Sequence, residues 1–454
     1  MFNLNIEQIA ETLKGTVLNF DFNKIKVTNS VVSNHVDVQK NSIFIAIKGE
    51  KFDGHNFVKQ AINKGACLAI VEQKASNIPQ IIVPDTKIAL LKIAALNRQQ
   101  FSGPVIAVTG SFGKTTVKDL IACVLSQQQK ILKTQANLNN EIGVAQTMLN
   151  LNSQHKTAII ELGMSHKNEI SMLSQAVKPT IGVITNIGQS HFENFKNLNE
   201  ILQAKLELLD GMPSYGPIFF NADDPKLHAN LFTNHPTVSC SIKNNKADFY
   251  ADNITQTSNL LKFTAHYKNK SADFEIPLIG KFNALNSIIA IAIGHSQKIS
   301  IEKIQQALRT FKPTGLRQKL LKFNSITIFA DCYNASPETT TTALKAFSKM
   351  QCKGKKIAVI GDMLELGTIS QIAHEKLGIL INQLQIDEII CFGELSKYIC
   401  NKTKKPAHHF KSIDKLIYFV KNRIKPNDLI MFKASHAMNF EKLINKIFKN
   451  INYN

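Results

Sequence analysis

The stretch "VIAVTGSFGKTTVKDL", residues 105–120, constrains the fold more than any other part of the chain. The β-branched apolar run 105–108 predicts a short buried strand, and apolar residues recur just afterwards with the period of a helix, at Val117, Leu120, Ile121 and Val124. The glycines between the two elements therefore lie at a strand-to-helix turn. Such a turn favours an anion, because it presents backbone N–H groups without helical partners at the positive end of the helix dipole.

The residues of this turn predict a phosphate-binding loop. Gly110 and Gly113 let the backbone approach a ligand closely, Lys114 adds a mobile positive charge, and the Thr115 hydroxyl is suited to ligate magnesium. Only two residues separate the glycines, whereas the common P-loop has four residues between its first glycine and the final Gly-Lys pair. The sequence therefore predicts a shortened variant of that loop.

The composition is that of a soluble globular chain. Its 454 residues, 44% hydrophobic and 19% charged, are enough for about three domains. The N-terminal stretch "MFNLNIEQIA" shows no secretory signal, and apolar runs such as "IIAIAI" are too short to span a membrane, so we expect a cytoplasmic protein. The seven cysteines form no C-x-x-C pair, which indicates reduced thiols.

The formal net charge of +20 raises the possibility of a nucleotide-dependent nucleic-acid-binding protein, an alternative from a different functional class. Such a protein needs clustered basic residues with interleaved aromatic residues, but the lysines are scattered and tryptophan is absent. We interpret the charge as a solvated surface that also attracts small anionic substrates, and we expect no nucleic-acid partner.

Strand-like and helical runs alternate along the chain, which predicts an α/β fold with parallel sheets covered on both faces. The turns "FSGP" and "FKPTGLR" interrupt this alternation. They divide the chain into a smaller α/β N-terminal domain (1–102), a central P-loop domain with a parallel sheet (103–312) and a C-terminal domain (313–454). Ligands of parallel sheets bind beyond the carboxyl ends of the strands, so both later domains should contribute loops to one site.

Further polar residues lie where those loops are expected. Glu161 ends the apolar strand "AIIEL" and His191 follows "GVITNIGQSH", and both side-chain types can ligate magnesium, although an isolated histidine in a polar loop is more often only solvated. Lys205 lies on an amphipathic helix, where a surface lysine is the simplest interpretation. Arg317 and Asp331 bracket the start of the third domain. An arginine from another domain can stabilise a transferring phosphoryl group, and an exposed hinge arginine is the equal alternative.

Several stretches follow one another in the order found in a known family. They are "NLNNEIG" (137–143), "ELGMSHKNEI" (161–170), "TNIGQSHFENF" (185–195), "AKLELL" (204–209) and "NADD" (221–224). Together with the phosphate loop they resemble the Mur ligase family of peptidoglycan synthesis, over most of the chain. Within that family, "KGEKFDGHNF" (48–57), "YNASP" (333–337) and "GDMLELG" (361–367) are most similar to the members that add D-alanyl-D-alanine.

This resemblance implies a role for each domain and a reaction. The N-terminal domain would bind the UDP-sugar end of UDP-N-acetylmuramoyl-tripeptide, the central domain ATP, and a Rossmann-like C-terminal domain the incoming amine. Phosphoryl transfer from ATP to the tripeptide carboxylate would give an acyl phosphate, which the amine of D-alanyl-D-alanine attacks. We also expect a monomer without a membrane span.

The resemblance further implies the roles of individual residues. Lys114, His191, Lys205 and Arg317 would be catalytic. The nucleotide would contact Gly110, Ser111, Gly113, Lys114, Thr115, Thr116, Asn140, Asn283, Arg317 and Asp331. Thr115 and Glu161 would hold one magnesium ion, and His191 and Lys205 a second, with Lys205 carboxylated by carbon dioxide to become an anionic ligand.

The sequence departs from the family pattern outside the phosphate loop and the implied metal ligands. Asn34, His35 and Val36 replace the usual Asp-Ser-Arg, and "KASHAM" (433–438) replaces the commoner Lys-Gly-Ser-Arg. The nearest alternative is another ligase of the same superfamily. Folate ligases normally begin near the phosphate loop, whereas residues 1–104 precede it here, and the ligase that adds the third amino acid usually carries an Asp-Asn-Pro signature that this sequence lacks. A catalytically inactive scaffold is disfavoured by the joint presence of the implied catalytic residues.

Overall fold

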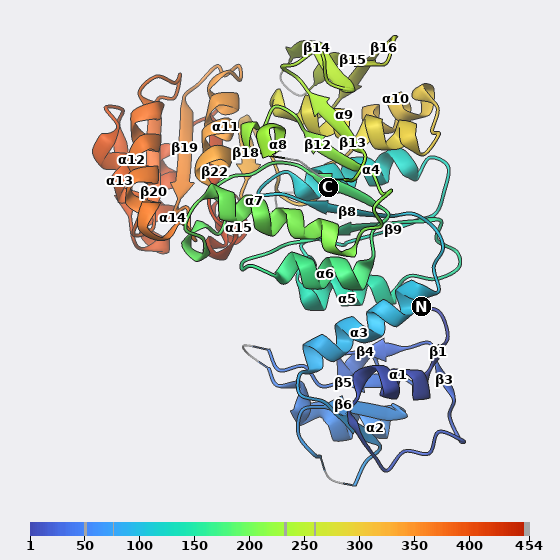
Figure 1. The fold of residues 1–454 in the computed structure, drawn as a ribbon. Coiled ribbons are helices and arrows are strands. Elements are labelled where there is room, and N and C mark those ends of the chain that lie inside the picture. Colours follow the sequence, from blue (N-terminus) through green and yellow to red (C-terminus); the bar gives the residue numbers. More distant parts are fainter. Residues whose placement is uncertain (50–51, 76, 231–233, 258–259, 449–454) are drawn as a thin grey trace.

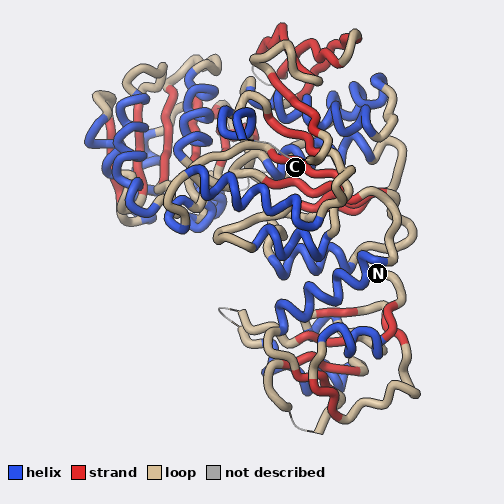
Figure 2. The backbone as a smooth tube through the Cα atoms, in the orientation of Figure 1, coloured by secondary structure: helices blue, strands red, loops and turns tan. Residues whose placement is uncertain are grey.

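The computed structural model describes residues 1–49, 52–75, 77–230, 234–257 and 260–448, which form three lobes (Figure 1). Helices and strands alternate in all three lobes, and the α/β class expected from the sequence is confirmed (Figure 2). Residues 50–51 of the "KGEKFDGHNF" stretch and the C-terminal residues 449–454 lie outside the described part.

The N-terminal lobe is built on a small, mainly parallel sheet. Among the described residues, this sheet has the order β2-β7-β6-β5-β4, and β2 pairs antiparallel to β7. Its strands are β2 (Thr16–Leu18), β4 (Val31–Val32), β5 (Ile43–Ile45), β6 (Leu68–Val71) and β7 (Gln80–Ile82), and β1 (Leu4–Asn5) pairs separately with β3 (Val27–Thr28). The helices are α1 (Ile6–Leu13), α2 (Val58–Lys64) and α3 (Thr86–Gln99).

The central lobe contains a sheet of nine strands within the described ranges, in the order β16-β15-β14-β13-β12-β11-β8-β10-β9. The strands are β8 (Val105–Thr109), β9 (Ile131–Lys133), β10 (Thr157–Glu161), β11 (Ile181–Ile184), β12 (Ile218–Asn221), β13 (Thr237–Ser241), β14 (Phe249–Gln256), β15 (Leu261–Tyr267) and β16 (Lys270–Ile276). The strands from β9 to β14 pair in parallel, as expected. Two antiparallel strands, β15 and β16, extend this sheet, which the sequence analysis did not predict.

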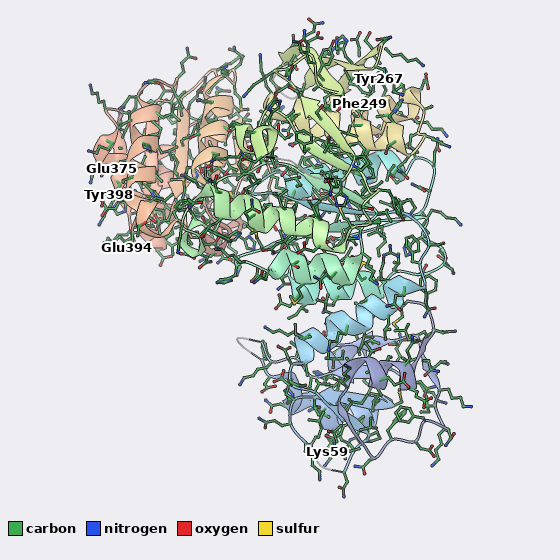
Figure 3. All side chains as sticks on the ribbon, viewed as in Figure 1. Lys59, Phe249, Tyr267, Glu375, Glu394 and Tyr398 are labelled. Atoms are coloured by element: carbon green, nitrogen blue, oxygen red, sulfur yellow. The ribbon has the colours of Figure 1, made fainter. Side chains whose placement is uncertain are left out.

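Helices cover both faces of the central sheet. They are α4 (Lys114–Leu125), α5 (Glu141–Leu149), α6 (Glu169–Val177), α7 (Leu198–Leu206), α8 (Pro225–Asn230), α9 (Phe282–Ser296) and α10 (Ile301–Arg309). Helices α4, α9 and α10 contribute to one apolar core and α5, α6 and α7 to another. On the antiparallel extension, the rings of Phe249 and Tyr267 stack with centroids 5.8 Å apart, so aromatic packing joins β14 to β15 (Figure 3).

The C-terminal lobe is an open sheet flanked by helices. Its described strands are β17 (Lys319–Phe323), β18 (Ile326–Asp331), β19 (Lys356–Gly361), β20 (Glu388–Phe392), β21 (Ala407–Phe410) and β22 (Leu429–Lys433), in the order β17-β18-β22-β19-β20-β21. All pairs are parallel except that of β17 with β18. The helices are α11 (Pro337–Ser348), α12 (Ser370–Ile381), α13 (Lys397–Lys402), α14 (Ile413–Arg423) and α15 (Phe440–Ile447).

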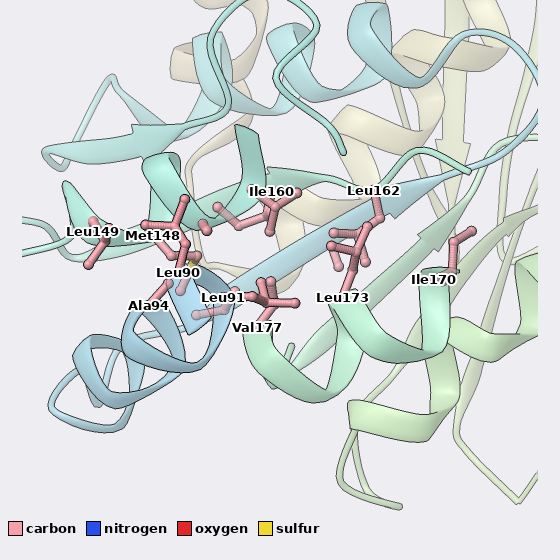
Figure 4. Packing of buried hydrophobic residues seen from close by; sticks show 14 of the residues in the cluster. Leu90, Leu91, Ala94, Met148, Leu149, Ile160, Leu162, Ile170, Leu173 and Val177 are labelled. Atoms are coloured by element: carbon pink, nitrogen blue, oxygen red, sulfur yellow. The ribbon is translucent and has the colours of Figure 1, made fainter. Parts of the chain in front are cut away.

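The apolar cores show how the lobes are joined. One core runs from the N-terminal lobe into the central lobe, where Leu90, Leu91 and Ala94 of α3 pack against Met148 and Leu149 of α5 (Figure 4). The C-terminal lobe instead has its own cores, which include a single residue, Ile279, from the central lobe among the described residues. The central and C-terminal lobes therefore share less buried apolar surface than the N-terminal and central lobes do.

Two expectations about the whole chain are answered by the structure. All seven cysteines are free thiols, as their spacing predicted. Among the described residues, no helix combines the length and the apolar character needed to cross a bilayer.

Candidate functional site

The glycine-rich loop has the geometry of an anion site. Strand β8 ends at Thr109 and helix α4 begins at Lys114. Gly110 and Gly113 have φ angles of 141° and 80°, and a Cβ at Gly110 would lie 2.0 Å from Thr185 Oγ1, so only glycine fits there. No side chain in the described part of the chain caps the N-terminus of α4, which leaves its first N–H groups for a bound anion.

The loop is held in place by the segment that follows β11. The Phe112 N–H donates to Asn186 Oδ1 at 2.9 Å, and the Asn186 amide donates back to the Phe112 carbonyl at 2.8 Å. The Ser111 hydroxyl oxygen accepts from the Gly188 N–H at 2.8 Å. These reciprocal bonds fix the loop backbone before any ligand binds.

Lys114 lies over the phosphate loop. Its ammonium group donates to the Gly110 carbonyl at 2.7 Å. Burial by the surrounding protein lowers the pKa of Lys114, the charge of Glu161 acts in the opposite direction, and the charge of Arg317 lowers it further. A bound polyphosphate would supply negative charge that offsets the positive charge of this desolvated ammonium.

Thr115 and Glu161 form a set of oxygen ligands suited to magnesium. The Thr115 hydroxyl donates to Glu161 Oε2 at 2.7 Å, and the Asn139 amide donates to Glu161 Oε1 at 2.8 Å. Glu161 is buried at the end of β10, as its position after an apolar run predicted. Among the described residues, no group of three or more His, Cys, Asp or Glu side chains could enclose a metal. A magnesium ion here would therefore share its coordination with the phosphate oxygens of a nucleotide.

Arg317 lies on the linker between the central and C-terminal lobes. Its guanidinium stacks on the Tyr333 ring, 3.4 Å from the ring centroid, and its Nη2 is buried without a hydrogen-bond partner. The next residue, Gln318, accepts a hydrogen bond of 3.1 Å from the Asn283 amide on α9. The linker therefore presents a pre-oriented positive group beside the phosphate loop.

Asp331 is buried at the end of β18 and pairs with a lysine of the neighbouring strand. Lys433 Nζ, at the end of β22, lies 2.9 Å from Asp331 Oδ2 and also donates to the Asn334 carbonyl at 2.5 Å. This pair fixes the strand ends of the C-terminal sheet that face the phosphate loop.

His191 contacts the C-terminal lobe. Its φ angle is 56°, and its Nδ1 lies 2.7 Å from Glu365 Oε2, while the Glu193 N–H donates to the Glu365 carbonyl. The hydrogen bond from His191 lowers the pKa of Glu365, and burial partly opposes this effect. The structure thus joins His191 to a carboxylate that the sequence analysis did not single out.

Lys205 is buried, not at the surface as its amphipathic helix suggested. Burial lowers the pKa of its amine well below the ordinary value, and the charge of Lys114 lowers it further. Within the described residues, no hydrogen bond or ion pair joins Lys205 to His191.

Asn140 caps the N-terminus of α5, where its side chain accepts from the Gly143 N–H at 3.0 Å.

These elements surround a cavity of about 580 Å³ between the central and C-terminal lobes. Of the residues singled out from the sequence, its lining includes Ser111, Gly113, Lys114, Thr115, Thr116, Glu161, His191, Asn283, Arg317 and Asp331, but not Gly110, Asn140 or Lys205. The cavity therefore combines an anion site, oxygen ligands for a cation and an arginine from a second lobe. This arrangement is suited to phosphoryl transfer.

The sequence analysis missed several charged and polar residues of this site. They are Lys118, Asp119, Asn139, Thr314, Tyr333, Glu365 and Lys433. Lys118 and Asp119 carried a usable signal, because two adjacent charges lie between the apolar residues Val117 and Leu120 of the predicted helix. Such charges on a helix beside a core are unusual unless they are paired.

Comparison with known families matches all three lobes. The family described as "Mur ligase family, catalytic domain" matches residues 33–102, "Mur ligase middle domain" matches 108–294, and "Mur ligase, glutamate ligase domain" matches 316–436. The matches follow one another along the chain, and the phosphate loop lies in the second.

Curated proteins match over nearly the full length. UDP-N-acetylmuramoyl-tripeptide--D-alanyl-D-alanine ligase of Bacillus subtilis (strain 168) is 34% identical, with 99% of both chains covered, and the protein of that name from Escherichia coli (strain K12) is 32% identical with the same coverage. A crystal structure of MurF from Acinetobacter baumannii matches with a TM-score of 0.90 and 28% identity over 99% of this chain and all of the other. MurF ligase from Thermotoga maritima in complex with ADP matches with a TM-score of 0.84 and 27% identity over 92% of this chain and 97% of the other.

Proposed function

Because the chain belongs to the Mur ligase family, we propose that it is an ATP-dependent ligase that joins D-alanyl-D-alanine to UDP-N-acetylmuramoyl-tripeptide in peptidoglycan precursor synthesis. The observation that carries this proposal is the convergence of Lys114, Glu161 and Arg317, from two lobes, on one cavity. A nucleic-acid-binding protein would not need that arrangement.

The proposed chemistry begins with activation of the tripeptide carboxylate, since a carboxylate is a poor electrophile. A carboxylate oxygen bonds to the γ-phosphorus of ATP while the bond from that phosphorus to the β–γ bridging oxygen breaks, which gives an acyl phosphate and ADP. The free amine of D-alanyl-D-alanine then bonds to the acyl carbon, the carbon–oxygen bond to phosphate breaks, and the amine proton leaves to solvent. The products are an amide, ADP and phosphate.

The residues of the cavity fit distinct parts of this reaction. Thr115 and Glu161 would hold a magnesium ion, which would offset charge on the phosphates. Lys114 would contact the β- and γ-phosphates, and the unpartnered Nη2 of Arg317 would bind the γ-phosphoryl oxygens. Asn283 and Asp331 would lie along the nucleoside. Each assignment places an existing donor or acceptor against a group of opposite character.

Lys205 and His191 would serve a second magnesium ion. An ammonium would repel that ion, but burial lowers the pKa of Lys205, which favours the neutral amine that can add to carbon dioxide. The amine nitrogen would bond to the carbon of carbon dioxide and release one proton to solvent, so the resulting carbamate would carry a negative charge and two oxygen ligands. His191 would reach the same ion through Nε2, because its Nδ1 is engaged by Glu365.

The three lobes would divide the substrates between them. Residues 1–102 would bind the UDP-sugar, 103–312 the ATP, and 313–454 the D-alanyl-D-alanine. The protein would act in the cytoplasm as a monomer.

The deciding experiment supplies ATP, magnesium and UDP-N-acetylmuramoyl-tripeptide with D-alanyl-D-alanine, D-alanine or glutamate in turn. We expect phosphate release and amide product only with D-alanyl-D-alanine, and neither with Lys114→Ala. Turnover with another amine would move the protein to a different ligase of this superfamily. The tripeptide is supplied in two forms, with diaminopimelate and with lysine as the third residue, so that the same assay identifies the preferred form.

A further inference from the structure

The linker between the central and C-terminal lobes, residues 312–318, is fastened to the nucleotide-binding lobe on both sides of Arg317. Before it, the Thr314 hydroxyl donates to Asp119 Oδ2 on α4. After it, Gln318 accepts from the Asn283 amide on α9 at 3.1 Å. Arg317 therefore lies between two fixed points, and both anchoring helices line the same cavity.

Asp119 is a rigid anchor. The residue is only 5% exposed, and its Oδ1 accepts from Lys133 Nζ at 2.7 Å and lies 3.5 Å from Lys118 Nζ. Lys118 Nζ in turn lies 3.7 Å from Glu161 Oε2. Asp119 also follows Thr115 by one turn of α4, so a network of charges connects the linker to the phosphate loop and its oxygen ligands.

Packing contributes little to holding the linker just before Arg317, so the hydrogen bond to Asp119 matters more there. Gly315 has a φ angle of 65°, and no atom lies within 4 Å of the position that a Cβ would take, so no neighbouring residue packs against the linker on that side. Arg317 follows two residues later with its Nη2 buried and unpartnered. On the N-terminal side of this glycine, the bond from Thr314 to Asp119 is the hydrogen bond that ties the described linker to the nucleotide-binding lobe.

We infer that Thr314 and Asp119 are positioning residues, which hold Arg317 beside the phosphate loop through the hydrogen bond between them. This inference rests on the proposed function, because it takes the cavity to bind a nucleoside triphosphate. The Thr314 hydroxyl donates its hydrogen bond to Asp119 and not to a nucleotide. Thr314 would therefore influence phosphate binding through the position of Arg317.

A double-mutant cycle on nucleotide binding tests this inference. The dissociation constants of ADP and of a non-hydrolysable β,γ-imido analogue of ATP are measured by calorimetry with magnesium. We expect Thr314→Val to weaken binding of the triphosphate about fivefold and of ADP less than about twofold, since one positioning hydrogen bond is lost. Thr314→Ser keeps the hydroxyl and should restore the wild-type value.

In the Arg317→Ala background, Thr314→Val should add no further loss. Effects that add in the double variant, or equal losses for ADP and the triphosphate, would overturn the inference. Thr310→Val is the matched control, because Thr310 is exposed near the end of α10 and its hydroxyl bonds only within that helix.

The readout separates this inference from the proposed function. If the wild-type protein joins no amine to the sugar-peptide but the cycle is non-additive, the proposed function fails and the positioning role stands. If the ligase reaction proceeds but the cycle is additive, the positioning role fails alone.

Discussion

The two joints of the molecule differ in their chemistry. At the first joint, α3 packs into an apolar core shared with α5 and α6, and Arg98 donates to the Val177 and Lys178 carbonyls at the end of α6. At the second joint, the apolar cores of the C-terminal lobe include only Ile279 of the described central lobe, and the other contacts named above are polar, as between His191 and Glu365. A shared apolar core resists separation, whereas a polar contact such as that of the half-exposed Glu365 exchanges readily with water.

This difference indicates which joint moves. Domain closure around the cavity is a hypothesis of ours, and the structure favours the linker near 313 over the boundary near 102 as its hinge. Scattering that does not change when an ATP analogue and the sugar-peptide are added would contradict closure. The comparison also predicts that substitutions at the second joint lower activity and those at the first joint lower stability.

The largest effect is expected for Glu161→Gln, beside the second joint. Glutamine keeps the shape of the side chain and one of the two oxygens that accept hydrogen bonds, but removes the charge that would face a magnesium ion. We expect kcat to fall about 10³-fold, which corresponds to an activation free energy higher by about 4 kcal/mol. We also expect the magnesium concentration that gives half-maximal activity to rise. Steady-state kinetics measure both. A fall in thermal stability large enough to explain the lost activity would contradict this assignment.

The next effect is expected at the first joint, for Leu90→Ala. Leu90 is 1% exposed in the shared core, so the cavity left by its truncation should lower the free energy of unfolding by about 3 kcal/mol. Denaturant titration measures this change, and kcat should stay within about twofold of wild type. Lys92→Ala, on the exposed side of the same helix, is the control. Equal losses of unfolding free energy in the two variants would contradict the role of the shared apolar core at the first joint.

Asn97→Ala tests the polar part of the first joint. The buried Asn97 amide donates to the Met148 and Leu151 carbonyls at 2.8 and 2.9 Å, and its Oδ1 accepts from the Phe2 N–H at 2.9 Å, so its loss removes three hydrogen bonds. We expect a loss of about 2 kcal/mol in the free energy of unfolding, with faster hydrogen exchange at the end of α5. Gln99→Ala, exposed on the same helix, should change neither.

The sequence predicted the elements whose pattern is local. The loop at Gly110–Lys114 follows from one strand and one helix, and Glu161 could be placed because it directly ends an apolar run. Parallel-sheet topology then brings these residues to one edge. The same local rules found Arg317 and Asp331 at the start of the third lobe.

What could not be predicted depends on contacts between distant segments. The helical period of 198–206 does not reveal that Lys205 is buried, because the covering residues come from elsewhere in the chain. The partner of His191 lies on the loop after β19, and its choice depends on how two lobes dock. Strands β15 and β16 carry the alternation of an antiparallel hairpin, which the expectation of a wholly parallel sheet overlooked.

The smallest effect is expected for Glu365→Gln at the second joint. The hydrogen bond from His191 lowers the pKa of the Glu365 carboxyl, so the carboxylate stabilises the docked lobe above its ordinary pKa and loses that effect as pH falls through the lowered value. Since about half of this side chain is exposed, at 51%, solvent screening limits the contribution to below about 1 kcal/mol. A fluorescence-transfer pair across the two lobes should show a slightly more open variant at neutral pH, and this difference should shrink as the wild-type carboxyl is protonated. A difference that persists at acidic pH would mean that the side chain acts by its shape and not by its charge.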